Sequence, residues 1–167
     1  MKYLIAGLGN PGEKYEKTRH NIGFKVLDAL TDASDTFFTA ERYAHKAEIK
    51  YKGRKLILIK PTTYMNRSGK AVRYWLEKEN LMPDALLVIV DDIALPFGYI
   101  RIKTGGSDGN HNGLADIIRI LGRQDFNRLR FGIGNDFPRG MQAEYVLSAW
   151  SKDEKRLLPE RIKKMGE

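Results

Sequence analysis

Hydrophobic and polar positions repeat with two different periods along the chain, and this pattern predicts a mixture of strands and helices. Short apolar runs at residues 3–8 and 86–92 precede segments in which apolar residues recur every three or four positions. The run 86–92 is so uniformly apolar that we expect a central strand that is covered on both faces. Residues 44–51 and 54–61 flank Lys52-Gly53, so they are expected to form a hairpin.

Helical spacing follows several of these runs. We expect one helix after Thr18 and another after Ser68, with each of these residues as an N-cap, and a third helix over 114–122 that Gly122 closes. Together with strands at 99–104 and 128–135, these elements predict an α/β fold with a mixed central β-sheet flanked by helices. The length of 167 residues favours a single domain over 1–167. The charged C-terminal segment is helix-prone, and we expect Pro159 to interrupt it.

Composition narrows the possible chemistry. Lys and Arg number 29 against 21 Asp and Glu, and the formal charge of +8 favours an anionic partner such as nucleic acid. The chain has no cysteine, which excludes disulfides, thiolate nucleophiles and cysteine-based metal sites. No apolar run is long enough for a signal peptide or a membrane span, so we expect a cytoplasmic protein.

Gly7, Gly9 and Gly12 spell G-x-G-x-x-G after an apolar run, which is the spacing of a dinucleotide-binding turn. In such a turn the helix starts within the motif, whereas here Pro11 and the polar stretch EKYEK separate the glycines from the helical periodicity. We therefore expect no bound cofactor. We interpret the glycines as a sharp turn at the carboxyl end of a strand, where α/β proteins place their ligands.

Polar side chains follow several of the predicted strands and loops. Asn10 follows the first strand, Asn66 lies in the loop before the Ser68 helix, Asp91 ends the central strand and Asn112 lies in the second glycine loop. Because strand ends on one sheet edge converge, these residues and His20 could line one cleft. Each of them also has a structural alternative, since Asn and Asp are common in turns.

His20 is a candidate general base. An imidazole in the first turn after Thr18 lies near the positive end of a helix, which disfavours its protonated form. A carboxylate such as Asp91 would fix its tautomer and stabilise the cation formed during proton transfer. The alternative is a surface or capping histidine.

Five blocks of the sequence resemble, in order and spacing, the signature blocks of the bacterial peptidyl-tRNA hydrolase family. The blocks are GLGNPGEKYEKTRHNIGF, KPTTYMNRSGKAV, Asp91 followed by LPFG, GGSDGNHNGLADII and RLRFGIGN, and the resemblance extends from residue 3 to about 150. It implies hydrolysis of the ester that joins a peptide to the 3′-terminal ribose of tRNA. Such an ester is already activated relative to an amide, so a water deprotonated by His20 would suffice.

The resemblance also implies a role for individual residues. His20 matches the catalytic base, Asp91 matches its support, and Asn10 matches the residue that separates peptidyl from free aminoacyl substrates. The other implied positions all contact substrate: Tyr15, Tyr64, Met65, Asn66 and Asn112 near the peptide, and Lys103 and Arg130 at the tRNA 5′-phosphate. We expect a monomer that acts on peptidyl-tRNA without a metal or cofactor.

Two other functions remain open at this point. One is a non-catalytic RNA-binding relative of the same fold, similar to splicing factors, and turnover of peptidyl-tRNA would separate it from an enzyme. The other is a metal-dependent phosphoesterase that uses Asp91, Asp92 and His111, for which a chelator is the test.

One departure from the family concerns the C-terminus. Members usually continue with a further helical segment, whereas this sequence stops at KKMGE. The C-terminal segment is therefore expected to be cut off or absent, which would weaken the grip on substrate and leave the His20 site intact.

Overall fold

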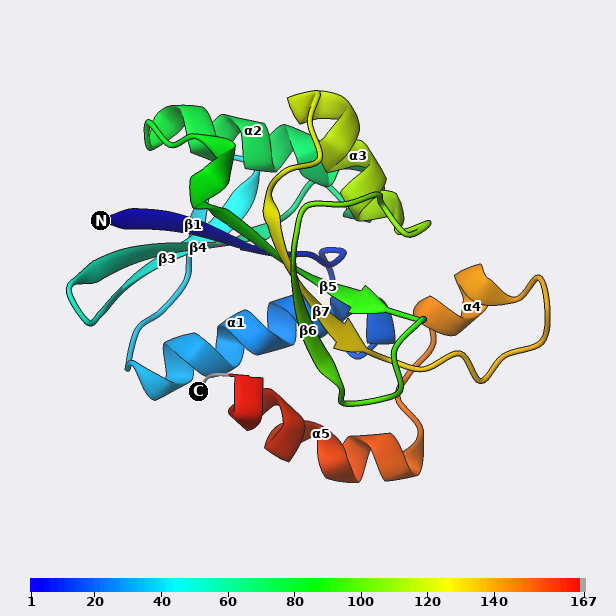
Figure 1. Cartoon of the computed structure of the whole chain (residues 1–167). Coiled ribbons are helices and arrows are strands. Elements are labelled where there is room, and N and C mark those ends of the chain that lie inside the picture. Colours follow the sequence, from blue (N-terminus) through cyan, green and yellow to red (C-terminus); the bar gives the residue numbers. More distant parts are fainter. Residues whose placement is uncertain (166–167) are drawn as a thin grey trace.

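The protein is built around a mixed β-sheet, as the sequence predicts. The computed structural model describes the backbone of residues 1–165 and the side chains of residues 1–158. Within this part of the chain, seven strands form one sheet in the order β2-β3-β4-β1-β5-β7-β6. Its centre is parallel and consists of β1 (Lys2–Gly7), β4 (Arg54–Pro61), β5 (Leu86–Asp92) and β7 (Asn127–Gly132) (Figure 1).

Antiparallel strands complete both edges of the sheet. On one edge, β2 (Thr39–Glu41) pairs with β3 (Ala44–Tyr51), which in turn pairs with β4. On the other edge, β6 (Ile100–Thr104) pairs with β7. The predicted hairpin at Lys52-Gly53 is confirmed: both residues have positive φ, at 50° and 79°, as a two-residue turn of the type favoured between β-strands requires.

Helices cover both faces of the sheet. In Figure 1, α2 (Ser68–Lys78) and α3 (Asn112–Leu121) lie above it, while α1 (Ile22–Ala33) and α5 (Lys152–Met165) lie below it. The short helix α4 (Gln142–Val146) lies at the side, and single turns precede three of the elements: η1 (Arg19–Asn21), η2 (Met65–Arg67) and η3 (Pro83–Ala85). No helix in the described residues is both long and apolar enough to span a membrane.

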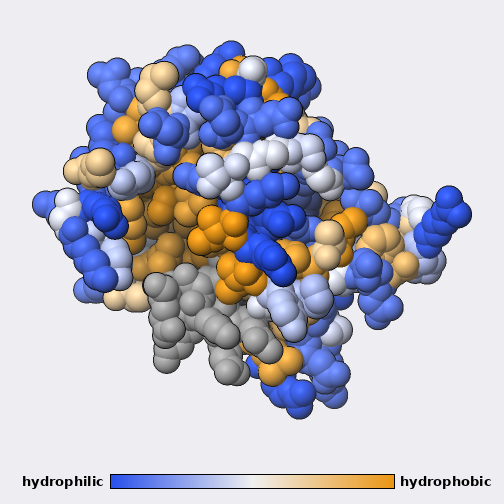
Figure 2. All heavy atoms as spheres, in the orientation of Figure 1, coloured by the Kyte–Doolittle hydropathy of each residue, from blue (hydrophilic) through white to orange (hydrophobic). Residues whose placement is uncertain are grey.

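The sheet separates two hydrophobic cores. Val88 and Val90 of β5 pack in the core with α2 and α3, whereas Ile89 packs in the core with α1. All three are almost fully buried, so the expectation of a central strand covered on both faces is confirmed. On the face shown in Figure 2, polar residues cover the upper helices, and hydrophobic residues gather below them.

Neither predicted N-cap residue makes a capping hydrogen bond, and only Thr18 lies at an N-cap position. Thr18 precedes η1 and its hydroxyl donates to the Tyr15 carbonyl at 2.8 Å, and Ser68 is already inside α2 and donates to the Met65 carbonyl at 2.7 Å. Both hydroxyls act as donors to carbonyls three residues earlier, which closes a local turn instead of capping amides of the helix. The predicted end of the third helix is confirmed, because Gly122 follows α3 with a left-handed φ of 73°.

The predicted interruption at Pro159 is also wrong, because the backbone of α5 is helical from Lys152 to Met165. The helix starts with a capping box, in which Ser151 Oγ accepts from the Glu154 amide at 3.2 Å and Glu154 Oε1 accepts from the Ser151 amide at 2.8 Å. Leu158, one residue before the proline, is buried in the core shared with α1. This packing outweighs the one hydrogen bond that a proline removes.

Close backbone packing explains Gly7 of the glycine-rich turn. A methyl group on Gly7 would overlap the Gly23 carbonyl and lie 2.8 Å from Leu27 Cγ, and one on Gly23 would lie 2.6 Å from the Leu8 carbonyl oxygen. The two glycines therefore let α1 lie directly against the end of β1. Because α1 starts only at Ile22, after a loop and η1, the helix does not open inside the G-x-G-x-x-G motif as a dinucleotide-binding turn requires.

Replacing Gly23 tests this packing. In an ordinary helix position Gly→Ala stabilises by up to about 1 kcal/mol. In Gly23→Ala the added methyl would press on Leu8 and lie 2.8 Å from the Ile89 carbonyl oxygen, so we expect a net loss of about 1–3 kcal/mol in the free energy of unfolding. Urea denaturation measures the sign, and an unchanged or more stable variant would show that the contact is not tight.

Candidate active site

The carboxyl ends of the parallel strands bring the polar residues together at one edge of the sheet. The loop after β1 carries Asn10, the loop after β4 carries Tyr64 and leads into η2, and β5 ends in Asp91-Asp92. Because β1 pairs with both β4 and β5 in parallel register, all three strands end on the same side. His20 reaches this edge from η1, where it contacts Asp91. The N-terminus of α3 lies above the same edge (Figure 1).

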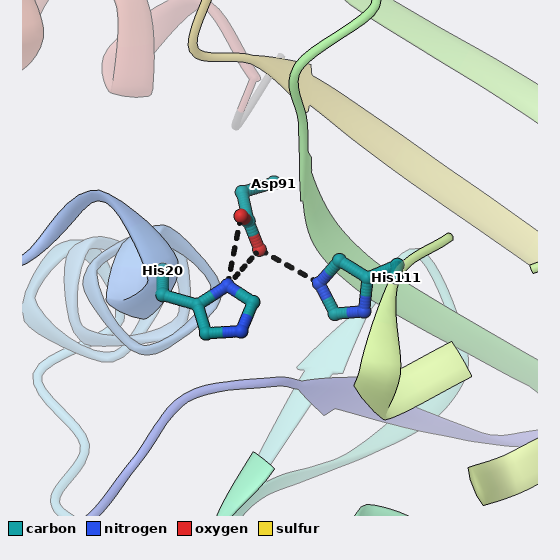
Figure 3. A group of neighbouring side chains, drawn as sticks. All are labelled: His20, Asp91 and His111. Atoms are coloured by element: carbon teal, nitrogen blue, oxygen red, sulfur yellow. Dashed lines mark hydrogen bonds and ion pairs between the residues drawn. The ribbon is translucent and has the colours of Figure 1, made fainter. Parts of the chain in front are cut away.

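The buried carboxylate of Asp91 holds His20. The Nδ1 atom of His20 lies 2.9 Å from Asp91 Oδ1 and 2.8 Å from Oδ2, with both residues less than a tenth exposed. Figure 3 shows that the opposite edge of the ring points away from the carboxylate. Since an ionised carboxylate only accepts hydrogen bonds, the contact requires the proton on Nδ1 and leaves the Nε2 lone pair free to accept a proton.

A second imidazole binds the same carboxylate. His111 Nε2 lies 2.8 Å from Asp91 Oδ1, and the two histidine rings lie 5.0 Å apart between centroids (Figure 3). The Nδ1 atom of His111 accepts from the backbone amides of Gly113 and Leu114, at 3.1 and 3.2 Å, and so caps α3. Because Nδ1 is an acceptor, the ring proton is on Nε2 and is donated to Asp91. The helix cap therefore fixes the tautomer of His111.

The two imidazoles keep Asp91 ionised. Burial by itself would raise the pKa of this carboxyl group, since a charge is poorly solvated in the protein interior. The interactions with His20 and His111 outweigh burial and hold the pKa of Asp91 well below its usual value. The carboxylate is thus charged at neutral pH and accepts from both rings.

Asn10 is fixed by a network next to His20. Its backbone amide donates to Asn21 Oδ1 and its carbonyl accepts from Asn21 Nδ2, both at 2.8 Å. Its side-chain oxygen accepts from the Met65 amide at 2.6 Å. The Nδ2 group of Asn10 makes no hydrogen bond to the described residues, so it remains available as a donor.

Tyr64 has a strained backbone beside this network. Its φ of 68° and ψ of 154° lie in a region that glycine normally occupies, which costs about 1–3 kcal/mol for another residue. The conformation starts η2 and directs the amide of Met65 at Asn10. The half-exposed ring of Tyr64 makes an edge-to-face contact with Tyr15, with centroids 6.3 Å apart. Strain of this kind is concentrated at functional sites.

Met65 and Asn66 differ in exposure although they are neighbours in η2. Met65 is 4% exposed, and its sulfur would lie 2.7 Å from a methyl group on Gly113, so it packs under the N-terminus of α3. Asn66 is exposed. Met65 therefore supports the site from within, whereas Asn66 can contact a ligand on the surface.

A cavity of about 390 Å³ connects the histidine pair to a basic wall. His20, Asp91 and His111 line it together with Asn112 at the start of α3. Lys103 of β6 and Arg130 of β7 also line the cavity and form its basic wall. The structure thus brings His20, Asp91, Asn112, Lys103 and Arg130 to one cavity. Asn10 and Tyr64 do not line it, and they follow β1 and β4, which lie on the other side of β5 from β7 and β6.

The basic residues of this wall are not equivalent. Arg128 is 1% exposed and donates to the carbonyls of Ser107 and Gln124 at 2.8 and 2.7 Å, so it braces the glycine loop. Arg130 pairs with Asp92 at 2.8 Å. Among residues with described side chains, Lys103 has no carboxylate within ion-pair distance, so it is the cation of this wall that is freest to meet an anion.

The metal-ligand set considered from the sequence is not assembled. The Asp92 carboxylate points to Arg130 and to the Ala94 amide, which donates to it at 2.8 Å, and so it does not join Asp91 and His111. The three groups that do converge are His20, Asp91 and His111, whose ligand atoms lie within 4.8 Å of one another. His20 Nδ1 and His111 Nε2 each carry the proton that they donate to Asp91. Binding of a metal ion to these atoms would require both protons to leave.

The sequence pattern did not predict roles for Arg19 and Asn21, the neighbours of His20. Asn21 holds the backbone of Asn10. Arg19 is buried, contacts Ser148, pairs with Glu154 at 2.8 Å and lies over the ring of Tyr145 at 4.2 Å. It thereby fastens η1 to the segment that contains α4 and the start of α5. The sequence around Arg19 gives no sign of this role, because the residues that Arg19 contacts are more than a hundred residues away in the chain.

Comparisons with the sequences and structures of known proteins place the chain in a family. The sequence model of the family described as peptidyl-tRNA hydrolase matches residues 4–167. The peptidyl-tRNA hydrolase of Azobacteroides pseudotrichonymphae is 58% identical over 98% of this chain and 88% of its own length, and that of Bacteroides fragilis is 55% identical over 100% and 89%. The crystal structure of the peptidyl-tRNA hydrolase of Acinetobacter baumannii superposes with a TM-score of 0.90 at 36% identity, over 96% of this chain and 83% of that one.

The matches therefore agree in sequence over nearly the whole chain and in the arrangement of the strands and helices that carry the site. The polar residues at the carboxyl edge of the sheet come from the sequence blocks that carried the resemblance. This chain belongs to the peptidyl-tRNA hydrolase family.

Proposed function

We propose that the protein hydrolyses the ester between a peptide and the 3′-terminal ribose of tRNA, with His20 as general base. The observation that supports this proposal most directly is the orientation of His20, whose Nδ1 is held by the buried Asp91 carboxylate at 2.8 Å in the wall of the cavity. The free Nε2 can then accept a proton from a water molecule. Base catalysis of this kind typically contributes about 10²- to 10⁴-fold.

Asp91 acts through His20 in this mechanism. The carboxylate keeps the ring proton on Nδ1 and stabilises the imidazolium that forms when water loses its proton. His111, which also donates to Asp91, holds the carboxylate in place. The reaction needs no nucleophilic side chain, because the hydroxide generated at His20 attacks the ester carbonyl directly. The bond to the 3′ oxygen of the ribose then breaks, and the His20 imidazolium returns its proton to that oxygen.

Side-chain amides bind the peptide part of the substrate. Asn112 in the cavity, and Asn10 and Asn66 on the Tyr64 side, offer donors to the peptide carbonyls and to the developing oxyanion. In this proposal, the free Nδ2 group of Asn10 also favours peptidyl over free aminoacyl substrates. An acylated amine presents a carbonyl that accepts from Nδ2, whereas a free aminoacyl ester presents an ammonium that has only donors and is costly to bury.

The tRNA binds on the other side of His20 in this proposal. Lys103 and Arg130 line the cavity wall on the β6–β7 edge, where they can contact the phosphates at the acceptor end. Phosphate contacts fix the position of the tRNA without reading its sequence. A non-catalytic RNA-binding protein would need these cations but not the paired His20 and Asp91, so the geometry favours an enzyme.

Substrate comparison tests the reaction and its lack of metal. We expect the protein to release peptide from N-acetylaminoacyl-tRNA much faster than it releases the amino acid from the same tRNA with a free amine. A chelator should leave the rate unchanged, because the His20–Asp91 pair supplies the base without a metal. No turnover of the blocked substrate would contradict the proposed function, and loss of turnover with chelator would support a metal-dependent reaction.

His20→Ala tests the identity of the base. Removing the ring should lower kcat/KM for N-acetylaminoacyl-tRNA by about 10²- to 10⁴-fold. His45→Ala is the matched control, because His45 is exposed on β3 and remote from the cavity lining. Circular dichroism and thermal unfolding should show that both variants are folded. Wild-type turnover by His20→Ala would mean that another group is the base.

Asp91→Asn tests how the carboxylate acts. Asparagine keeps the shape of the side chain, but its Nδ2 group would face a ring N–H of His20 or His111, so one hydrogen bond is lost and the tautomer of His20 is no longer fixed. We expect kcat to fall by at least about tenfold. The Kd for an amide-linked, non-hydrolysable peptidyl-tRNA should change little. An equal loss of both would indicate that Asp91 only shapes the binding site.

A further inference from the structure

A second cationic surface lies on the opposite side of His20 from Lys103. It consists of Arg42, Tyr43, Lys70 and Tyr74, and we call it the Arg42 surface. The Arg42 guanidinium and the Lys70 ammonium lie 5.1 and 4.8 Å from the centre of the Tyr43 ring, and Tyr74 contacts that ring edge-to-face at 5.4 Å. Strand β3, next to this surface, lies near one edge of the sheet, whereas β6 with Lys103 forms the other edge.

The backbone below the Arg42 surface is held firmly in place. Arg42 and Tyr43 form the turn between β2 and β3, where Tyr43 has a left-handed φ of 64°. The indole of Trp75, which is 2% exposed, donates to the Arg42 carbonyl at 2.9 Å and so fixes the turn against α2. The side chains of Arg42 and Lys70 remain exposed. The turn thus presents two cations and two aromatic rings on a rigid support.

The charge of this surface is not neutralised within the described residues. Neither Arg42 nor Lys70 has a carboxylate within ion-pair distance among them, and the adjacent Glu41 accepts from the Thr39 hydroxyl at 3.0 Å. Arg73 adds a further exposed cation three residues after Lys70, on the same side of α2. The hydrogen bond from Arg42 and the nearby charges of Arg42 and Lys70 lower the pKa of Tyr43, as expected in a positive field.

The Arg42 surface continues directly from the Asn10 side of the site. The Tyr43 carbonyl accepts from the Thr62 amide at 2.8 Å, two residues before Tyr64. Lys70 lies in the first turn of α2, which follows η2 and the Met65 amide that binds Asn10. A chain that leaves Asn10 past Tyr64 would therefore meet the Arg42 surface next.

We propose that the Arg42 surface binds the upstream residues of the peptide and favours acidic peptides. The inference rests on the proposed function, in which the tRNA lies along the Lys103 side and the peptide must leave on the other. Exposed guanidinium and ammonium groups bind carboxylates, and the Tyr43 and Tyr74 rings offer apolar contact beside them. A peptide extends only about 3.3–3.6 Å per residue, so the residue at the ester stays with Asn10 and only longer peptides reach this surface.

The test compares peptides of different length and charge on the same tRNA. The substrates are N-acetylaminoacyl-tRNA and two longer peptidyl-tRNAs of equal length, one with Glu and one with Lys at its upstream positions. For the wild type we expect kcat/KM to be roughly three- to tenfold higher with the acidic than with the basic peptide, as weak pairing with two exposed cations allows. The ratio should approach one in the double variant Arg42→Ser, Lys70→Ser, and in the wild type at high salt.

A matched control separates this local effect from total charge. The double variant Lys50→Ser, Arg54→Ser removes the same residue types from the far end of the β3–β4 hairpin and should keep the wild-type ratio. Turnover of N-acetylaminoacyl-tRNA should be equal in all three proteins. An unchanged ratio in the Arg42, Lys70 variant would overturn the proposal. The proposal would also be overturned if the Arg42, Lys70 variant lost as much kcat/KM on N-acetylaminoacyl-tRNA as on the longer substrates, because the surface would then bind the tRNA. If the wild type cleaved none of the substrates, the proposed function itself would fail.

Discussion

The site depends on one buried carboxylate that accepts hydrogen bonds from two imidazoles. Asp91 lies at the tip of the central strand, where burial would favour its neutral form if it were alone. The N–H groups of His20 and His111 reverse that preference and keep it charged. Each ring is in turn fixed by its place in the fold, His20 in η1 and His111 as the cap of α3. The carboxylate therefore joins β5, η1 and α3 into one unit. In this arrangement the proton of the neutral His20 ring is on Nδ1, so the lone pair of Nε2 remains free.

The surrounding structure serves mainly to hold this unit in position. Gly7 and Gly23 allow β1 and α1 to approach closely, and this brings η1 next to the strand ends. Asn21 binds the backbone of Asn10, so the residue that follows His20 also fixes the loop that carries Asn10. Arg19, the residue before it, ties η1 to the C-terminal part of the chain through Glu154. Arg19, His20 and Asn21 thus connect α5, the proposed base and the loop that carries Asn10.

Exposed cations lie in two separate places around the site, and in the proposed function each place faces a different part of the substrate. Lys103 lines the wall toward β6, next to the cavity, and can meet phosphate. Arg42 and Lys70 are stacked on tyrosine at the other side, beyond Asn10 and Tyr64. Arg128, in contrast, is buried and serves the glycine loop. A basic composition predicts an anionic partner. Only the three-dimensional structure distinguishes a cationic side chain that is free to bind a ligand from one that holds a loop in place.

The sequence by itself determined the α/β class, the central strand, the Lys52-Gly53 hairpin and the family, because these depend on local periodicity, turn chemistry and residue blocks. Only the tertiary structure decided which side chains meet. It showed that His111 shares Asp91 with His20, that Asp92 turns away to Arg130, and that α5 continues past Pro159 because Leu158 is buried. The hydroxyls of Thr18 and Ser68 donate to carbonyls three residues earlier instead of accepting from helix amides, and the sequence pattern did not distinguish between these two local partners. Each of these outcomes is set by competition among partners, many of them distant in the chain, which local patterns do not contain.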